Sequence, residues 1–393
     1  MPESPVPLVR PGPVVLALGF RPFFLGAGVL AVVAMPLWLA VLRGWLPGDS
    51  YYGATTWHAH AMLFGYGTAV IAGFLLTATR NWTGMATASG WELGALAGLW
   101  LAGRIAPWLP VPGPLIAALD VAFPLLLALS LLKPLWHGPN RANRVFLGLL
   151  AGMSAASLLV HLQTLGLTGG TALVGDRLML GLILVTLLIV SGRILPFFTR
   201  SAVPGAAPRV RPWVEWLTFG LAGLWVLADV AWPGSLLAGV LALGLAAVQV
   251  LRLVGWHHPG VWANAMLWVL YSGYLWLILG VLLNGLAHLG LVAPFPALHA
   301  LTVGTIGVFT LGMMSRITLG HTGRVMRVPP AMTAAFWTLN LAALARVFGP
   351  LLGPSSYAEW LWVSGVLWTL AFGLFLWVHA PMLILPRADG RPG

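Results

Sequence analysis

The sequence predicts an all-α membrane protein of about twelve transmembrane helices, and three features of its composition carry this prediction. The chain has 393 residues, of which 59% are hydrophobic. Only 7% are charged, whereas soluble domains carry about a quarter charged residues. The apolar residues gather in runs of about twenty, the length that a helix needs to cross a bilayer core. The lipid bilayer is therefore the first partner that the sequence implies.

Twelve apolar runs end at proline, glycine or charged residues, and we predict each as a span. The first, 20–42, is too long for the core of a signal peptide and lacks an obvious small-residue cleavage site. The others follow at 56–78, 91–110, 113–132, 145–166, 172–195, 213–231, 235–253, 263–284, 296–319, 331–350 and 359–384. They leave no room for a soluble domain, so we expect one polytopic membrane domain over residues 1–393.

The basic excess of the chain has a topological cause. The net charge is +11, and a soluble protein with this charge would be a candidate for binding nucleic acid. In a membrane protein the positive-inside rule accounts for it, because arginine and lysine collect in cytoplasmic loops. With a cytoplasmic N-terminus, nearly all basic residues lie on or near the inside, and Arg43 alone lies clearly in an outer loop. We expect both termini in the cytoplasm and no nucleic-acid partner.

The chain contains no cysteine. This excludes disulfides, thiolate copper sites, cysteine-ligated iron–sulfur clusters and covalently attached c-type haem. Histidine, methionine, tyrosine and carboxylates remain as the ligands that a metal or a haem could use.

The second span opens on two histidines, His58 and His60. An imidazole in or near the bilayer core is costly unless it binds something, so the pair marks a candidate functional site. Residues two apart on a helix point about 200° away from each other, so the two rings would not chelate one ion. One ring would face a neighbouring helix, and the other a second site or the membrane interface. The alternative is that both are interfacial histidines bonded to backbone at a helix start.

The second and tenth spans look like copies of one unit. The copies are eight spans apart, so a four-span unit used three times is the natural hypothesis, with the sixth span as a weaker third member. Three four-helix units are also the layout of the catalytic subunit of haem-copper oxidases and nitric oxide reductases. That analogy fails at the sixth and seventh spans, which lack the histidines of the second metal. One constant offset pairs His60 with His299, Gly65 with Gly304, Gly73 with Gly312, Thr79 with Thr318, and Thr83-Gly84 with Thr322-Gly323.

Two imidazoles at equal depth on pseudo-symmetric helices could hold a six-coordinate b-type haem. We therefore predict His60 and His299 as the axial ligands of haem b, with His58 and His161 as the next candidates. His161, near the outer end of the fifth span, could instead be a satisfied interfacial histidine. The glycines beside the aligned histidines would let a flat macrocycle approach, although ordinary helix packing explains glycines equally well.

Charged side chains inside the predicted spans are the other candidates. Arg104 and Asp120 lie in the outer halves of adjacent spans and should form an ion pair, since either charge alone in the bilayer would be expensive. Arg177, and with it Arg104, could instead meet haem propionates, which need cationic partners. The alternatives for Arg177 are a pair with Asp176 or a contact with lipid headgroups.

Long motifs follow one another along nearly the whole chain. They are Gly19-Phe20-Arg21-Pro22-Phe23-Phe24, Trp57-His58-Ala59-His60 through Asn81-Trp82-Thr83-Gly84, Gly103-Arg104, Asp120, His161, Gly192-Arg193, Pro196-Phe197-Phe198-Thr199-Arg200, and His299-Ala300-Leu301-Thr302-Val303-Gly304 through Gly320-His321-Thr322-Gly323-Arg324. This set resembles the NnrS family, polytopic bacterial membrane proteins linked to nitric oxide metabolism and reported to bind haem and copper.

The resemblance implies a haem protein of the bacterial inner membrane that acts in the response to nitric oxide, which would then be a ligand. The chain departs from the family pattern at Ala61, where a glutamate usually follows the second histidine, and at Tyr271, where a histidine is common. These losses count against a copper site and leave the haem prediction untouched. Turnover of nitric oxide by an oxidoreductase, sensing and buffering all stay open, as does the electron donor.

Two other classes of protein share some of these features. A twelve-helix secondary transporter of a small anion or metal complex would account for the span count and for the buried Arg104 and Asp120. Against it, transporters usually show paired halves with sites at the midplane. A structural or assembly subunit would show neither a chromophore nor a flux.

Overall fold

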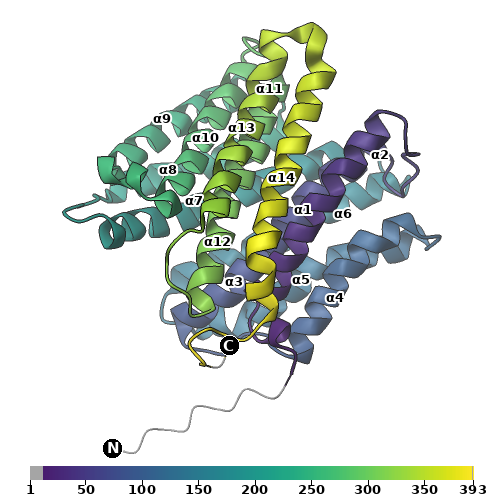
Figure 1. Cartoon of the computed structure of the whole chain (residues 1–393). Coiled ribbons are helices and arrows are strands. Elements are labelled where there is room, and N and C mark those ends of the chain that lie inside the picture. Colours follow the sequence, from purple (N-terminus) through teal and green to yellow (C-terminus); the bar gives the residue numbers. More distant parts are fainter. Residues whose placement is uncertain (1–11, 392) are drawn as a thin grey trace, which may run out of the picture.

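The computed structural model describes residues 12–391 and 393, and within them the chain is helical without a β-strand. The helices form twelve rods, two of which contain a π-helical segment (Figure 1). The bounds are α1 Phe20–Leu42, α2 Ala54–His60, α3 Thr68–Thr83, α4 Trp91–Ile105, α5 Gly113–His137, α6 Val145–Thr164, α7 Thr171–Ala202, α8 Pro212–Ala231, α9 Leu236–Trp256, α10 Ala265–His288, α11 Pro294–His299, α12 Phe309–His321, α13 Pro330–Leu352 and α14 Tyr357–Ile384.

The predicted all-α membrane fold is confirmed, and every predicted span coincides with a rod. Among the described residues, 11 rods are long and apolar enough to cross a membrane. The twelfth, α4, has 15 residues. Its helix is shorter than the predicted 91–110 because a 3₁₀ turn follows at Ala106–Trp108, where Pro107 cannot donate a helical hydrogen bond.

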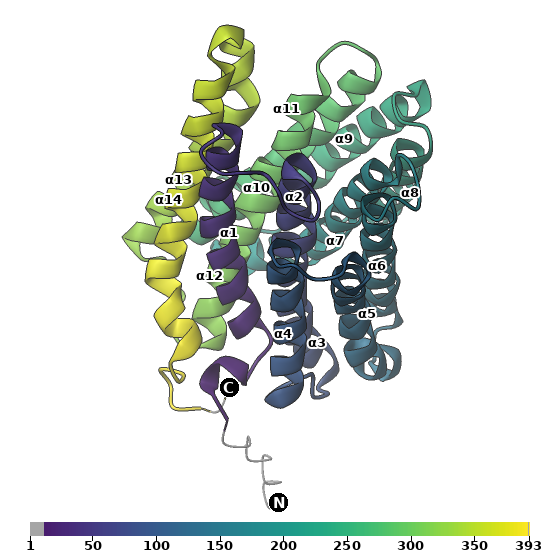
Figure 2. The ribbon, with the colours of Figure 1, turned by 90° about the vertical axis from the view of Figure 1, so that its right-hand side faces the viewer.

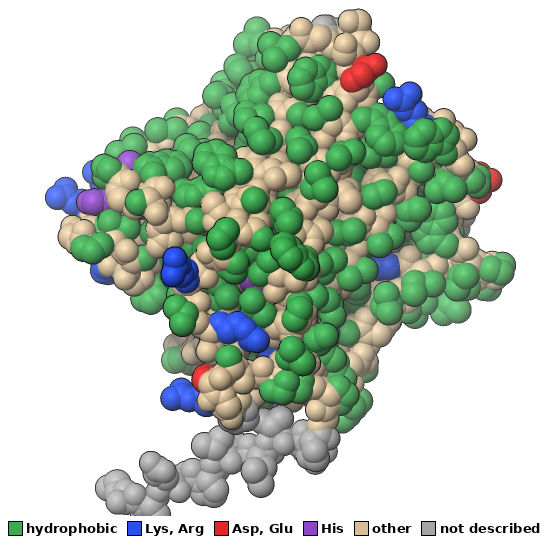
Figure 3. Space-filling model, viewed as in Figure 1, with side chains coloured by type: hydrophobic (Ala, Val, Ile, Leu, Met, Phe, Trp, Pro, Cys, Tyr) green, Lys and Arg blue, Asp and Glu red, His purple; other side chains and the backbone are tan. Residues whose placement is uncertain are grey.

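The outside of the molecule matches a lipid environment. Figure 3 shows a face covered largely by hydrophobic side chains, with few charged groups between them. Large apolar side chains such as Trp216, Val254 and Trp377 are more than two-thirds exposed. In water such a surface would aggregate, whereas against lipid tails it is satisfied.

Consecutive rods pack against each other, and α14 returns to lie along α1 (Figures 1 and 2). Arg21, buried at the start of α1, donates to the carbonyls of Leu383, Leu385 and Gly393 at 3.0, 3.0 and 2.8 Å. The start of the first span and the end of the chain therefore lie at one end of the bundle.

The second and tenth rods form the centre of the bundle. Their most apolar windows are 89% and 78% buried, against 28% for α1. The sixth rod, α7, and the ninth, α10, follow at 61% and 67%. The grouping of these rods into three four-helix units stays a prediction.

The two central rods share an irregularity that supports the predicted repeat. In the second rod, α2 ends at His60 and a first π segment, Ala61–Gly67, leads into α3. In the tenth rod, α11 ends at His299 and a second π segment, Ala300–Val308, leads into α12. Both copies therefore leave α-helical geometry at the residue after the aligned histidine. Such π segments are rare and are frequently found at functional sites.

Glycines set the close approach of α10 to the second π segment. A Cβ on Gly280 would lie 2.6 Å from Leu301 Cδ2 and 3.0 Å from the Leu301 backbone nitrogen, and one on Gly304 would lie 2.6 Å from Trp276. We expect Gly280→Ala to lower the free energy of unfolding by about 1–3 kcal/mol through overpacking. Thermal unfolding of the detergent-solubilised variant and wild type measures this loss of stability.

Gly220→Ala in α8 is the matched control, because a Cβ there meets nothing within 4 Å. Replacing a helical glycine by alanine at an open position raises helix stability by about 1 kcal/mol. Equal melting temperatures for the two variants would show that the close approach at Gly280 does not limit the packing.

Candidate functional site

The second rod carries its two histidines into different cavities. His58 and His299 line a cavity of about 330 Å³ between the second and tenth rods. His60 lines a larger cavity of about 580 Å³ between α1 and α4. We call them the His58–His299 cavity and the α1–α4 cavity. The divergence of the two rings agrees with their spacing of two residues on a helix.

Asp120 of α5 is the centre of a buried polar cluster beside the α1–α4 cavity. Its Oδ2 lies 3.0 Å from His60 Nε2 and 3.4 Å from His161 Nε2, and it accepts a hydrogen bond from Ser157 Oγ at 2.6 Å. Its Oδ1 is paired with Arg104 Nη2. The predicted ion pair of Arg104 and Asp120 is present, and both side chains are more than nine-tenths buried.

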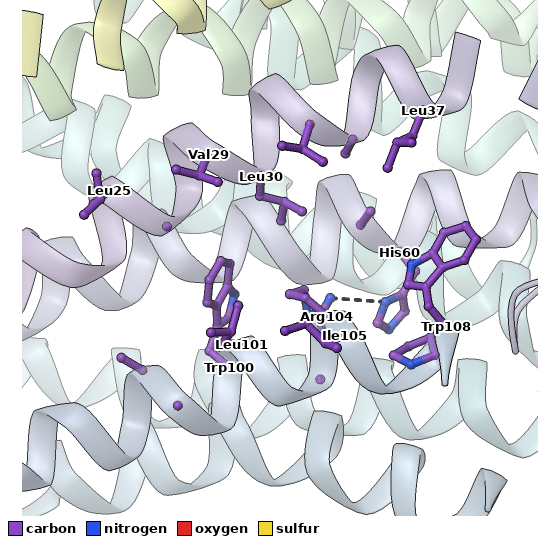
Figure 4. Close-up of a pocket in the computed structure, with 18 of the residues that line it drawn as sticks. Leu25, Val29, Leu30, Leu37, His60, Trp100, Leu101, Arg104, Ile105 and Trp108 are labelled. Carbon is purple, nitrogen blue, oxygen red and sulfur yellow. Dashed lines mark hydrogen bonds between the residues drawn. The ribbon is translucent and has the colours of Figure 1, made fainter. Parts of the chain in front are cut away.

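The partners of His60 fix its tautomer. Arg104 Nη1 lies 3.3 Å from His60 Nδ1 (Figure 4), and a guanidinium can only donate. His60 therefore accepts at Nδ1, is a neutral imidazole, and carries its hydrogen on Nε2, which faces Asp120. The ring stacks on Phe64 with 4.5 Å between centroids and an angle of 2°.

Two adjacent tyrosines complete the cluster from the loop before α2. Tyr51 Oη lies 3.2 Å from His161 Nδ1, while Tyr52 Oη lies 3.2 Å from His60 Nε2 and 3.4 Å from His161 Nε2. Burial raises the pKa of Tyr52, so the phenol stays a neutral hydroxyl at physiological pH. Sequence reasoning missed both tyrosines, although they stand directly before the helix that carries the histidines.

One ligand atom each from His60, Asp120 and His161 lies within 4.8 Å of the others, a spacing that a metal ion could use. The hydrogen on His60 Nε2 instead directs that nitrogen's bond to Asp120. Arg104, Ser157 and the two imidazoles already give the carboxylate of Asp120 the donors that a buried charge needs. The cluster thus fits a closed hydrogen-bond network, and His60 and His161 as metal ligands stay a prediction.

The His58–His299 cavity presents two imidazoles whose partners differ. His299 Nδ1 donates to the carbonyl of Phe295 at 3.0 Å, which leaves Nε2 as a free lone pair, the arrangement usual for a metal-binding histidine. His58 Nδ1 is buried and has no hydrogen-bond partner in the described part of the chain. Trp38 holds the His58 ring by stacking, with 4.6 Å between centroids and an angle of 8°.

Arg346 of α13 adds a positive charge to this cavity. Its guanidinium lies 4.0 Å from the Phe295 ring centroid and 3.4 Å from Tyr357 Oη, and none of its contacts within residues 12–391 is an ion pair. Sequence reasoning placed Arg104 and Arg177 as partners of propionates instead. Arg104 is committed to Asp120, and Arg177, half-buried on α7, lines neither cavity. An arginine inside a span without an acidic neighbour was the missed signal.

The structure groups the predicted histidines as His60 with His161 and His58 with His299. It does not bring His60 and His299 to one cavity, although the repeat aligns them. The reason is the direction of the side chains on the second rod, where the face turned toward the tenth rod carries His58. His58 has no counterpart in the tenth rod, because the offset that aligns His60 with His299 places Ala297 opposite His58.

The chain was compared with known proteins. The model of the family described as NnrS protein matches residues 14–387, nearly the whole chain. A search of curated proteins finds no match.

Proposed function

The chain belongs to the NnrS family, and from this premise we propose that it is a haem-binding membrane protein of the nitric oxide response. Family membership supports the link to nitric oxide. The haem is our inference from the His58–His299 cavity.

The observation that carries the proposal is the state of the two imidazoles. His299 has its Nδ1 hydrogen bonded to Phe295 and its Nε2 free, while His58 has a buried Nδ1 without a partner. Both rings are held, one by that hydrogen bond and the other by stacking on Trp38. A buried polar atom without a partner costs about 1–3 kcal/mol, a cost that iron coordination would remove.

The rest of the cavity fits a haem as well. Apolar side chains such as Met35, Leu63 and Ile306 make up most of its lining, as a porphyrin face requires. Arg346 is the cationic partner that a propionate needs in an apolar surrounding. When bound, a haem held by both imidazoles supplies one-electron transfer, whereas a haem held by one leaves a position for nitric oxide.

Copper is not part of the proposal. Ala61 and Tyr271 stand where the family pattern has a carboxylate and an imidazole. Tyr271 bonds instead to Thr199 and to the Trp256 carbonyl, at 2.7 and 3.0 Å. For the location we propose the inner membrane of a bacterium with both termini in the cytoplasm, on the positive-inside bias of the loops.

The test is a spectrum of the wild-type protein, purified in mild detergent from cells supplied with a haem precursor. We expect a Soret band, b-type haem by pyridine haemochrome, and iron without stoichiometric copper. Nitric oxide added to the reduced protein then separates the two coordination states, because only an iron with an open position gives a nitrosyl band promptly. A folded chain without haem contradicts the proposal.

A further inference from the structure

The α1–α4 cavity opens toward the bilayer. Leu25, Val29 and Leu30 of α1 face Trp100 and Leu101 of α4 across it (Figure 4). Both helices contribute side chains that are about half exposed on the lipid-facing surface, among them Val29 (45%), Val33 (49%), Leu101 (49%) and Ile105 (48%). A membrane-soluble molecule could therefore enter sideways between the two helices.

The inner end of the cavity is polar, where Tyr52, His60 and Arg104 line it. Arg104 Nε is a buried N–H without a partner in the described residues. Tyr52 Oη lies beside the Nε2 atoms of His60 and His161. Because these nitrogens carry the hydrogens that they give to Asp120, neither can accept from Tyr52, and the phenol hydrogen is left without an acceptor in the cluster. The Arg104 Nε–H and the Tyr52 hydroxyl are thus two donors without acceptors at the polar end of an apolar cavity. A ligand with carbonyl oxygens would supply the missing acceptors.

The charge at this end favours a neutral ligand. Arg104 and Asp120 already neutralise each other, and His60 is neutral. A fatty acid or a phospholipid headgroup would add a negative charge without a counter-charge in an apolar surrounding, which is costly.

We propose that the α1–α4 cavity binds an isoprenoid quinone, with a ring carbonyl accepting from Tyr52 and Arg104 and the tail leaving between α1 and α4. The cavity of about 580 Å³ has the size of pockets that hold small cofactors. Trp57, Trp100 and Trp108 line it and offer faces for ring stacking. This inference goes beyond the proposed haem, since it names a membrane carrier and a second site.

The test is equilibrium binding of decylubiquinone to the full chain in nanodiscs of phosphatidylcholine. We expect saturable binding that is lost in Leu101→Trp, because the indole fills the cavity between the helices. Leu129→Trp in α5 is the matched control, since Leu129 is 54% exposed and does not line the cavity. Tyr52→Phe keeps the ring and removes the hydroxyl, and should weaken binding about three- to tenfold.

Competition with oleate separates a quinone from an anionic lipid. Quinone binding that persists at equal oleate concentration supports the neutral ligand, and displacement by oleate overturns it. Absence of saturable binding in a folded protein, or binding that Leu101→Trp leaves unchanged, overturns the site itself. The assay does not use haem, and none of these variants touches the His58–His299 cavity, so this result and the haem result are read separately.

Discussion

We expect His299→Ala to yield a folded protein that has lost its haem, and His58→Ala to give the same result. Each substitution removes one of the two imidazoles that line the His58–His299 cavity. Histidine side chains hold the iron of a non-covalent haem as axial ligands, so we expect the loss of one of them to cause at least about a tenfold fall in haem per chain. The measurement is the ratio of Soret to protein absorbance after purification, with a pyridine haemochrome count.

His60→Ala and His161→Ala are the controls for this experiment. Both residues belong to the Asp120 cluster and line no part of the His58–His299 cavity, so haem content should stay near the wild-type value. Haem lost in His60→Ala and kept in His58→Ala would restore the pairing that the aligned repeat predicts, and would contradict the assignment made from the cavities.

The second large expected effect is a loss of stability when the buried ion pair of Arg104 and Asp120 is broken. Asp120→Leu leaves the Arg104 guanidinium buried without its carboxylate, and we expect it to lower the free energy of unfolding by about 3–5 kcal/mol. The double variant Arg104→Met with Asp120→Leu removes both charges and should recover most of that loss, since apolar replacements of a buried pair are often neutral. Thermal and denaturant unfolding in detergent measure both.

Glu92→Leu on the exposed side of α4 is the surface control, and changes at such positions usually stay within about 0.5 kcal/mol. If the double variant is as unstable as Asp120→Leu alone, the loss comes from the hydrogen bonds of His60 and Ser157 to Asp120, and not from the unpaired charge. A double-mutant cycle separates the two contributions.

The sequence predicts the helices well because each crosses a bilayer. Apolar runs of about twenty residues bounded by Pro, Gly and charge are a strong signal, so every predicted span has its rod. The ion pair of Arg104 and Asp120 follows from the same physics, since two charges in adjacent spans have few other partners. The shortened α4 shows the limit, because hydropathy continues past Ile105 while Pro107 ends regular hydrogen bonding.

The site was harder to predict because the directions of the side chains decide which histidines share a cavity. The repeat fixes the depth of His60 and His299, but depth does not say which neighbour a ring faces. That depends on the rotation of the second rod, and the first π segment changes that rotation in a way that no periodic pattern reveals. Tyr52 and Arg346 were missed although the sequence places Tyr52 directly before the helix of the histidines and Arg346 inside a span. What the sequence does not reveal is that Tyr52 also reaches His161 and that Arg346 lies over the Phe295 ring, since these partners are distant in sequence.

The paired π segments also bear on the predicted duplication of the second and tenth spans. Helical segments of the π type are rare. Both central rods carry one at the residue after the aligned histidine, which is most simply explained by an ancestral unit that held the segment before it was duplicated. On that explanation, His60 and His299 descend from one residue. One copy came to hydrogen-bond a carboxylate, and the other to line the cavity that we assign to haem.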